Sequence, residues 1–276
     1  MIRHLSYVEE SILTNEALMN TEEGIKMVLR NLMVDDFDIE KLLPGDVQAI
    51  SLLLYSTAYG DKIEMEVKCP GCSIKEKKDV LISKFQMKEI PTWPDENRKL
   101  EGVLPASKMP FRLRIPTFFE EFRHKKRMDN SESHLERLMF LMEKMGDYAP
   151  EELPEAIVRM NIRDSRFLRK FIDQNTPGVD THVAHECSEC QQEYTVHVSG
   201  GHNFLHLPES FAASLLEEIY LVVKHGEGIS WEAATHMSTH QRKWVLLRIK
   251  KDKNAQNEAD AKAASRVKQT KHIRKH

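Results

Sequence analysis

The sequence predicts a mainly helical α+β fold built around two separate β-hairpins. Its four cysteines form two pairs, Cys69–Cys72 and Cys187–Cys190, each with two residues between the cysteines. Each pair lies between two stretches in which apolar and polar residues alternate, the pattern of a half-buried strand. Much of the remaining chain carries apolar residues at the three- and four-residue spacing of a helix. We therefore expect two cysteine-bearing hairpins, a large helical insertion between them, and a helical C-terminal region.

The two cysteine pairs indicate a shared metal site. A strand, a C-x-x-C turn and a second strand form the usual zinc knuckle, and two knuckles supply the four thiolates of a closed tetrahedral site. We expect the first half of a split zinc ribbon in residues 61–83 and the second half in residues 180–204. A site with four thiolates leaves no position for water, so the ion is expected to be structural rather than catalytic. The predicted ligands of this Zn²⁺ ion are Cys69, Cys72, Cys187 and Cys190.

The distance along the chain between the pairs leaves alternatives open. Between Cys72 and Cys187 lie 114 residues, whereas an ordinary ribbon has roughly 15–20. The pairs could instead be redox dithiols or inert buried cysteines. A redox pair is typically found at the start of a helix in a βαβ unit, and here each pair is expected in a hairpin. One shared site is favoured, because a single C-x-x-C offers only two ligands.

Residues 1–60 are expected to be helical. Ser6 and Glu9 have the spacing of a capping box, in which each residue satisfies a free backbone N–H of the other. Asn20 is expected to cap a second helix and Asp46 a third. The apolar face of the second helix consists of Ile25, Val28, Leu29 and Leu32.

The insertion, residues 84–179, is expected to contain two short strands followed by helices. The strands are predicted at Lys99–Leu104 and Phe111–Ile115, where apolar side chains alternate with polar ones. Helices are predicted within residues 117–175, with Met142 on an apolar helical face.

Residues 205–249 are expected to form a C-terminal helical region. Pro208 is predicted to open its first helix and Ser230 to cap a short second helix. Trp231 and Trp244 are expected in the core of this unit. The alternative is that part of this surface docks a partner, because exposed aromatic residues are favoured interface anchors.

Residues 250–276 form a basic tail. The tail contains nine Lys or Arg and three Asp or Glu, a net charge of +6, while the rest of the chain carries −9. The tail lacks an apolar face, so we expect it to be a protruding helix or disordered. A basic arm on an acidic body is typical of an interaction segment, here including Lys250 and Lys251. An acidic partner protein is the expected target, with nucleic acid the less favoured one.

Composition limits the class of protein. The chain of 276 residues has 41% hydrophobic and 30% charged residues, which is ordinary for a globular protein with a buried core. We expect no membrane span and no signal peptide, because the sequence lacks the apolar runs that both require. The cysteines are therefore expected in a reducing compartment, which favours metal over disulfide. No phosphate-binding, dinucleotide-binding or nucleophile motif is visible, so we expect a protein that is not an enzyme.

Short motifs follow one another in a distinctive order along the chain: Leu43–Asp46, Ala58–Gly60, Cys69–Cys72, Asn175–Asp180, Cys187–Cys190, Asn203–Phe204, Leu216–Gly226, Ser230–Ala233 and Gln241–Trp244. This order resembles the baseplate hub and hub-assembly proteins of T4-like contractile-tailed bacteriophages. The resemblance runs from about residue 5 to about residue 249. Ser73 and Gln191 depart from the pattern, because a glycine commonly follows the second cysteine of such knuckles.

The resemblance implies a protein that is made in the host cytoplasm and works in baseplate assembly. Its partners would be other baseplate or tail proteins, and the resemblance leaves open whether it stays in the virion. A zinc ribbon that binds nucleic acid through the face of the ribbon and the tail at residues 250–276 is the alternative from another class. A metalloenzyme would need an open ligand position, which four thiolates do not leave.

Overall fold

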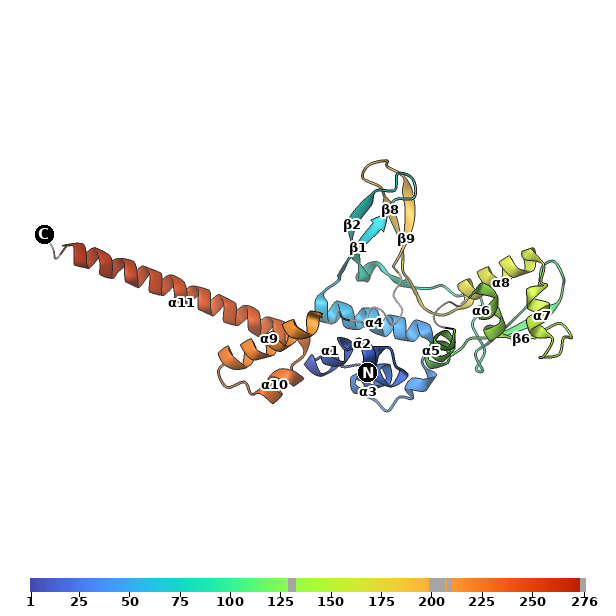
Figure 1. The fold of residues 1–276 in the computed structure, drawn as a ribbon, viewed down its shortest axis with the longest axis horizontal. Coiled ribbons are helices and arrows are strands. Elements are labelled where there is room, and N and C mark those ends of the chain that lie inside the picture. The colour runs from blue at the N-terminus through green and yellow to red at the C-terminus, as the bar shows by residue number, and fades with distance from the viewer. Residues whose placement is uncertain (129–132, 199–206, 208–209, 274–276) are drawn as a thin grey trace.

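The computed structural model describes residues 1–128, 133–198, 207 and 210–273 as a mixed helical and β structure. Figure 1 shows a central helical body from which two neighbouring hairpins project. A lobe formed by the insertion lies at one end of the body, and a long C-terminal helix extends from the other end.

The body is a cluster of N-terminal helices joined by one helix of the insertion. Its main core includes the predicted apolar face of α3, since Ile25, Val28, Leu29 and Leu32 are each fully buried. The elements are α1 (Tyr7–Leu13), α2 (Glu16–Met19), α3 (Glu22–Leu32), a 3₁₀ turn η1 (Ile39–Lys41), α4 (Pro44–Tyr59) and α5 (Phe118–Arg127).

Two predicted helix caps lie at other residues. Thr21, not Asn20, precedes α3, and its hydroxyl accepts the backbone N–H three residues later. Helix α4 begins at Pro44, where the missing N–H of proline has no consequence because the first turn of a helix has no carbonyl to pair it with. Asp46 therefore lies inside the first turn, and its carboxylate accepts the N–H of Leu43 at 2.8 Å. The expected box at the start of α1 is confirmed: the carboxylate of Glu9 accepts the N–H of Ser6 at 3.0 Å.

Two antiparallel hairpins stand next to each other on α4 (Figure 1). Residues Leu52 of α4, Ile82 after the first hairpin and Val179 before the second form a small buried cluster at their base. Both hairpins therefore start from the same support, although the insertion separates them in sequence. Their strands are β1 (Lys62–Lys68) and β2 (Lys75–Leu81), followed by the 3₁₀ turn η2 (Ile82–Lys84), and β8 (His182–Glu186) and β9 (Glu193–His197).

Two proline-glycine motifs meet beside this base. A Cβ atom added to Gly45 would lie 2.2 Å from the carbonyl oxygen of Pro177 and 2.6 Å from the Cα of Gly178. Only glycine allows this backbone approach. One turn along α4, Gln48 accepts the backbone N–H of Val179 at 3.2 Å. The contact fixes where the chain enters the second hairpin.

The insertion contains a strand that the sequence analysis missed. Met142 does not continue the preceding helix but begins β6, which pairs with β5. Both Met142 and Met145 are buried against the lobe core, and this packing outweighs the local helical spacing. The lobe and its connections contain β3 (Gln86–Met87), which pairs with β7 (Val179–Asp180), the sheet β4 (Lys99–Val103), β5 (Pro110–Arg114) and β6 (Met142–Met145), and the helices α6 (His134–Leu141), α7 (Leu153–Val158) and α8 (Ile162–Asn175).

The C-terminal region consists of α9 (Ser210–His225), α10 (Trp231–His236) and α11 (Thr239–Ile273). The predicted start at Pro208 lies outside the described residues. Ser230 caps α10 as expected, accepting the N–H of Ala233 at 3.1 Å. Helix α11 runs without a break through the expected boundary at 250 and projects beyond the body (Figure 1).

The core positions expected for the two tryptophans are wrong. Trp231 is 50% exposed and Trp244 is 63% exposed. The interior of the C-terminal unit is filled instead by Ile219, Val222 and Ala234. Apolar spacing alone cannot distinguish two faces of a helix when both carry large apolar residues, and here the tryptophans are on the outer one.

A buried ionic network attaches α11 to the body. The guanidinium of Arg242 is fully buried and donates to Glu10 of α1 at 2.5 Å and to Glu218 of α9 at 2.8 Å. The carboxylate of Glu10 also accepts the hydroxyls of Tyr59 at 2.7 Å and Thr239 at 2.9 Å. Burial, together with the charge of Glu10, raises the pKa of Tyr59. These bonds join four helices that lie far apart in the sequence.

In the described part of the chain, no helix combines the length and the apolar composition that crossing a membrane requires.

Candidate metal centre

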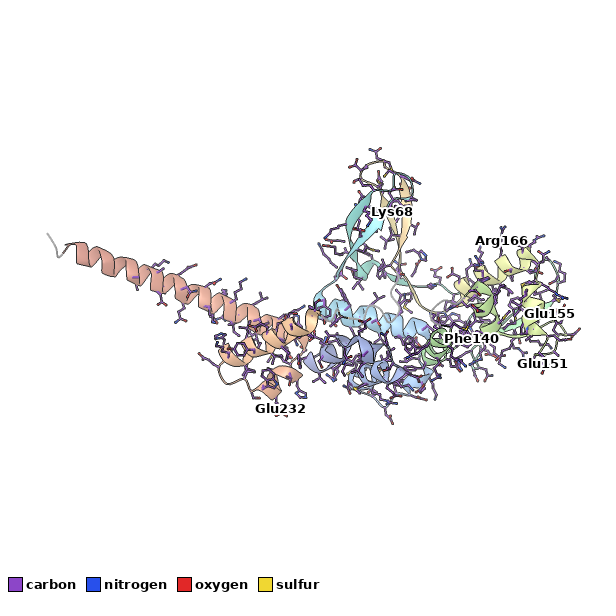
Figure 2. All side chains as sticks on the ribbon, in the orientation of Figure 1. Lys68, Phe140, Glu151, Glu155, Arg166 and Glu232 are labelled. Atoms are coloured by element: carbon purple, nitrogen blue, oxygen red, sulfur yellow. The ribbon has the colours of Figure 1, made fainter. Side chains whose placement is uncertain are left out.

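The four cysteines lie at the tips of the two hairpins. Figure 2 labels Lys68, the residue before Cys69, near the end of the hairpins that points away from the helical body. Cys69 and Cys187, the first cysteines of the two pairs, are buried, while Cys72 and Cys190 are exposed. The site is therefore peripheral to the fold and covered on one side by the hairpins.

The two turns have the same backbone hydrogen bonds. In the first, the N–H of Cys69 donates to Ile74 and the N–H of Ser73 donates back to Cys69, both at 3.0 Å. In the second, the N–H of Cys187 donates to Gln192 and the N–H of Gln191 donates back to Cys187, again at 3.0 Å. The two segments thus form matching knuckles.

The same turns show why a glycine commonly follows the second cysteine of such knuckles. Ser73 has φ +62° and Gln191 has φ +58°, which is the left-handed region that glycine adopts most easily. A residue with a side chain is strained there, so both knuckles hold this conformation at some cost in free energy.

The sulfur atoms form a compact group. The Sγ atoms of Cys69 and Cys190 are 3.6 Å apart, as are those of Cys72 and Cys187, and all four lie within 4.8 Å of one another. A tetrahedral zinc ion with Zn–S bonds of about 2.3 Å requires sulfur atoms about 3.8 Å apart. A disulfide needs sulfur atoms about 2.05 Å apart, so none of these pairs is bonded. The donor set and its spacing therefore fit a four-coordinate metal ion.

The four thiols affect one another's ionisation. Hydrogen bonds from the backbone, first that of Cys72, lower the pKa of the Cys69 thiol to about 6. For Cys72 itself, the backbone of Ile74 acts to lower the pKa, but desolvation and the neighbouring sulfurs outweigh it and raise this pKa to about 12. Four thiolates this close repel one another, so they ionise together only if a positive ion neutralises them.

The predicted site residues fall into two separate places. The four cysteines come together from segments 114 residues apart. Trp231, Trp244, Lys250 and Lys251 lie instead on α10 and α11. Among the residues that the structure describes, the cysteines are also the one group of three or more Cys, His, Asp or Glu side chains close enough to hold a metal ion.

Comparison with protein families identifies the chain's relatives. A family model described as T4 bacteriophage base plate protein matches residues 3–206. The chain belongs to this base plate protein family. The match covers the helical body, both knuckles and the insertion, so the four cysteines lie within the matched region. Comparisons with curated proteins and with solved structures each found no match.

The family match is shorter than the motif resemblance in the sequence. It ends at residue 206, before the motifs Leu216–Gly226, Ser230–Ala233 and Gln241–Trp244. The three C-terminal helices of this base plate protein are thus outside the matched region.

Sequence reasoning missed one residue that lies close to the cysteine group. Glu76 of β2 reaches the second hairpin, where it bonds to His185 and Ser188. The sequence pattern could have identified it. Alternate residues of a strand face the same side, so Glu76 lies on the same face of β2 as the buried Val80 and points inward.

Proposed function

We propose that this base plate protein acts in the hub of the phage tail baseplate, either as a hub component or as a factor that assembles the hub. The family match over residues 3–206 carries this proposal. In this function the protein is not an enzyme and works by contacting other baseplate or tail proteins. It would be made in the host cytoplasm and either remain there during assembly or enter the tail.

The cysteine group supports a structural Zn²⁺ ion and a split zinc ribbon. Cys69 and Cys72 would bind the ion from one hairpin, and Cys187 and Cys190 from the other. When bound, the ion would link two segments that are far apart in the sequence, and so restrict the unfolded chain. With four thiolate ligands it has no open position for substrate or water, which supports a structural rather than a catalytic role.

The outer surface of the C-terminal helices is the proposed partner-binding surface. Between α10 and α11 lies a groove of about 470 Å³ whose lining includes Met237, Trp244 and Val245. On the same two helices, Trp231 and Leu247 are 50% and 67% exposed. Large aromatic side chains that are exposed in a free protein are typical anchors of protein interfaces.

Charge favours an acidic partner for this surface. Lys250 and Lys251 lie on α11 one turn beyond the apolar residues and are exposed, and the segment 250–276 carries a net charge of +6. The 35-residue helix α11 is about 52 Å long at 1.5 Å per residue. Its residues 254–264 are all exposed. A second copy of the same arm would be repelled, so a negatively charged tail protein is the better match.

Trp244→Ala is expected to weaken co-purification with the partner by at least tenfold without unfolding the protein. The side chain is 63% exposed, so its removal costs little folding free energy but deletes an anchor of the groove. Pull-down from infected cells with mass spectrometry gives the partner, and circular dichroism checks the fold. Lys243, whose ammonium donates to Ala58 within the body, offers a neighbouring control as Lys243→Met. Unchanged capture by Trp244→Ala would contradict the proposed surface.

Deletion of residues 252–276 is expected to leave metal content and melting temperature nearly unchanged while weakening partner binding. The exposed part of α11 contributes little buried surface, whereas its charge attracts an acidic partner. The difference between full-length and truncated protein should shrink as salt rises, because exposed charges are screened. A loss of thermal stability, or strong hydrogen-exchange protection across residues 255–270 of the free protein, would show that the tail packs on the body.

Nucleic-acid binding is the alternative that the basic tail favours. The first hairpin argues against it, because lysines on its outer face are paired across the strands with acidic residues. These pairs are Lys62–Asp79, Lys75–Glu66 and Lys77–Glu64. A DNA titration over a range of salt concentrations separates the two functions. A nucleic-acid binder loses log affinity in proportion to log salt, at roughly 0.9 per neutralised phosphate.

A further inference from the structure

Glu76 connects the first hairpin to the second knuckle. Its carboxylate accepts the backbone N–H of Ser188 at 3.1 Å and also the hydroxyl of the same serine. The other carboxylate oxygen lies 3.1 Å from Nε2 of His185 on β8. The side chains of Glu76 and His185 are only 11% and 12% exposed. One carboxylate thus holds both the strand and the turn of the opposite hairpin.

The location of this carboxylate is unusual for a strand residue. Glu76 lies opposite Val67 in the β1–β2 register, on the face that turns toward the other hairpin. The remaining acidic residues of the hairpin, such as Glu64 and Glu66, point outward and are more than half exposed. A charged group on the inner face loses its hydration, and it stays charged only if hydrogen bonds from the protein replace the lost water. The hydrogen bond from Ser188, followed in size by the one from His185, lowers the pKa of Glu76 to about 2.

The two knuckles differ at the residue that Glu76 binds. In the first knuckle, the position after the first cysteine is Pro70, whose ring fixes φ and which has no N–H. In the second knuckle, the equivalent residue is Ser188, which is freer and does carry an N–H. Glu76 accepts that N–H, immediately after Cys187. The carboxylate supplies by hydrogen bonding the restraint that proline supplies covalently in the first knuckle.

We propose that Glu76 is a positioning residue of the metal centre, which holds the Cys187–Cys190 knuckle in its ligand-binding shape before the metal ion arrives. This rests on the proposed zinc site. The sulfur contacts between the hairpins require all four cysteines, whereas the bonds of Glu76 involve none of them. The carboxylate therefore keeps the hairpins together in the metal-free protein, and the metal ion binds to a site that is already assembled.

The test compares Glu76→Ala with Glu66→Ala in the full chain. Glu66 lies on the same hairpin and pairs with Lys75 at 2.7 Å, but it is on the outer face, so it is a matched control. Zn²⁺ affinity is measured by competition with a chromophoric chelator. Loss of a residue that orients metal ligands typically costs 10–100-fold in metal affinity. We expect a weakening of this size for Glu76→Ala and less than about threefold for Glu66→Ala, which keeps every ligand-orienting bond.

Two further measurements separate positioning from simple loss of folding. Glu76→Gln retains an acceptor for Ser188 and should recover most of the affinity. In metal-free protein, the Ser188 amide should exchange slowly in the wild type and in Glu66→Ala, but rapidly in Glu76→Ala. Equal Zn²⁺ affinity for Glu76→Ala and Glu66→Ala, or fast Ser188 exchange in metal-free wild type, would overturn the proposal. Failure of the wild type to bind Zn²⁺ would instead refute the zinc site on which it rests.

Discussion

Cys187→Ser is expected to abolish stable zinc binding and to lower the stability of the protein. Its Sγ atom is buried and lies 3.6 Å from that of Cys72, so its loss removes a ligand that joins the two knuckles. The affinity loss should exceed the roughly 10–100-fold that follows removal of an outer positioning residue. Because the binding free energy of a structural metal is also folding free energy, the melting temperature should fall.

Chelation supplies the control for this variant. Wild-type protein treated with a strong chelator should match Cys187→Ser in melting temperature, and returning Zn²⁺ should restore only the wild type. The helical body should remain folded in both cases, since its core is separate from the hairpins. A chelator that leaves wild-type stability unchanged would contradict a structural metal.

Arg242→Ala is expected to destabilise the attachment of the C-terminal helices by about 3–5 kcal/mol, the usual effect of breaking a buried ion pair. The variant leaves the carboxylate of Glu10, itself fully buried, without its cationic partner. Glu218 loses its bond as well but is partly exposed and can be hydrated. Chemical denaturation followed by tryptophan fluorescence reports the change, since Trp231 and Trp244 both lie in this region.

Arg248→Ala is the matched control on the same helix. Arg248 pairs with Asp252 on the surface at 3.0 Å, where both side chains are more than half exposed. An exposed pair contributes about 0.2–1 kcal/mol, so its loss should barely move the denaturation midpoint. Adding Glu10→Gln to Arg242→Ala removes the unpaired charge and should restore part of the stability. Similar midpoints for Arg242→Ala and Arg248→Ala would show that the buried network does not hold α11.

Local patterns in the sequence predicted the elements that depend on residues close together in the chain. The alternation in Lys62–Lys68 matches β1 residue for residue, and the cap at Ser230 holds because a serine hydroxyl satisfies a nearby free N–H wherever a helix begins. The cysteine group was also predictable, since the spacing within each pair specifies a knuckle. The family resemblance is confirmed over residues 3–206.

Tertiary packing determined what the sequence could not show. Met142 has helical spacing but pairs with β5, because the lobe core buries it there. Trp231 and Trp244 are large apolar residues of the kind expected in a core, yet the interior of their unit is filled by smaller side chains. The bonds of Arg242 to α1 and α9 join residues more than 20 positions apart, and no local pattern predicts them.

The most direct test of the zinc centre is X-ray absorption at the zinc edge, combined with elemental analysis of the purified full-length protein. The proposed site predicts one zinc per chain with four sulfur neighbours at about 2.3 Å and no nitrogen or oxygen neighbour. Serine at any one of Cys69, Cys72, Cys187 or Cys190 should reduce the sulfur count or the zinc content. Protein purified without chelators that contains no zinc, or a spectrum with fewer than four sulfur neighbours in the wild type, would contradict the shared site.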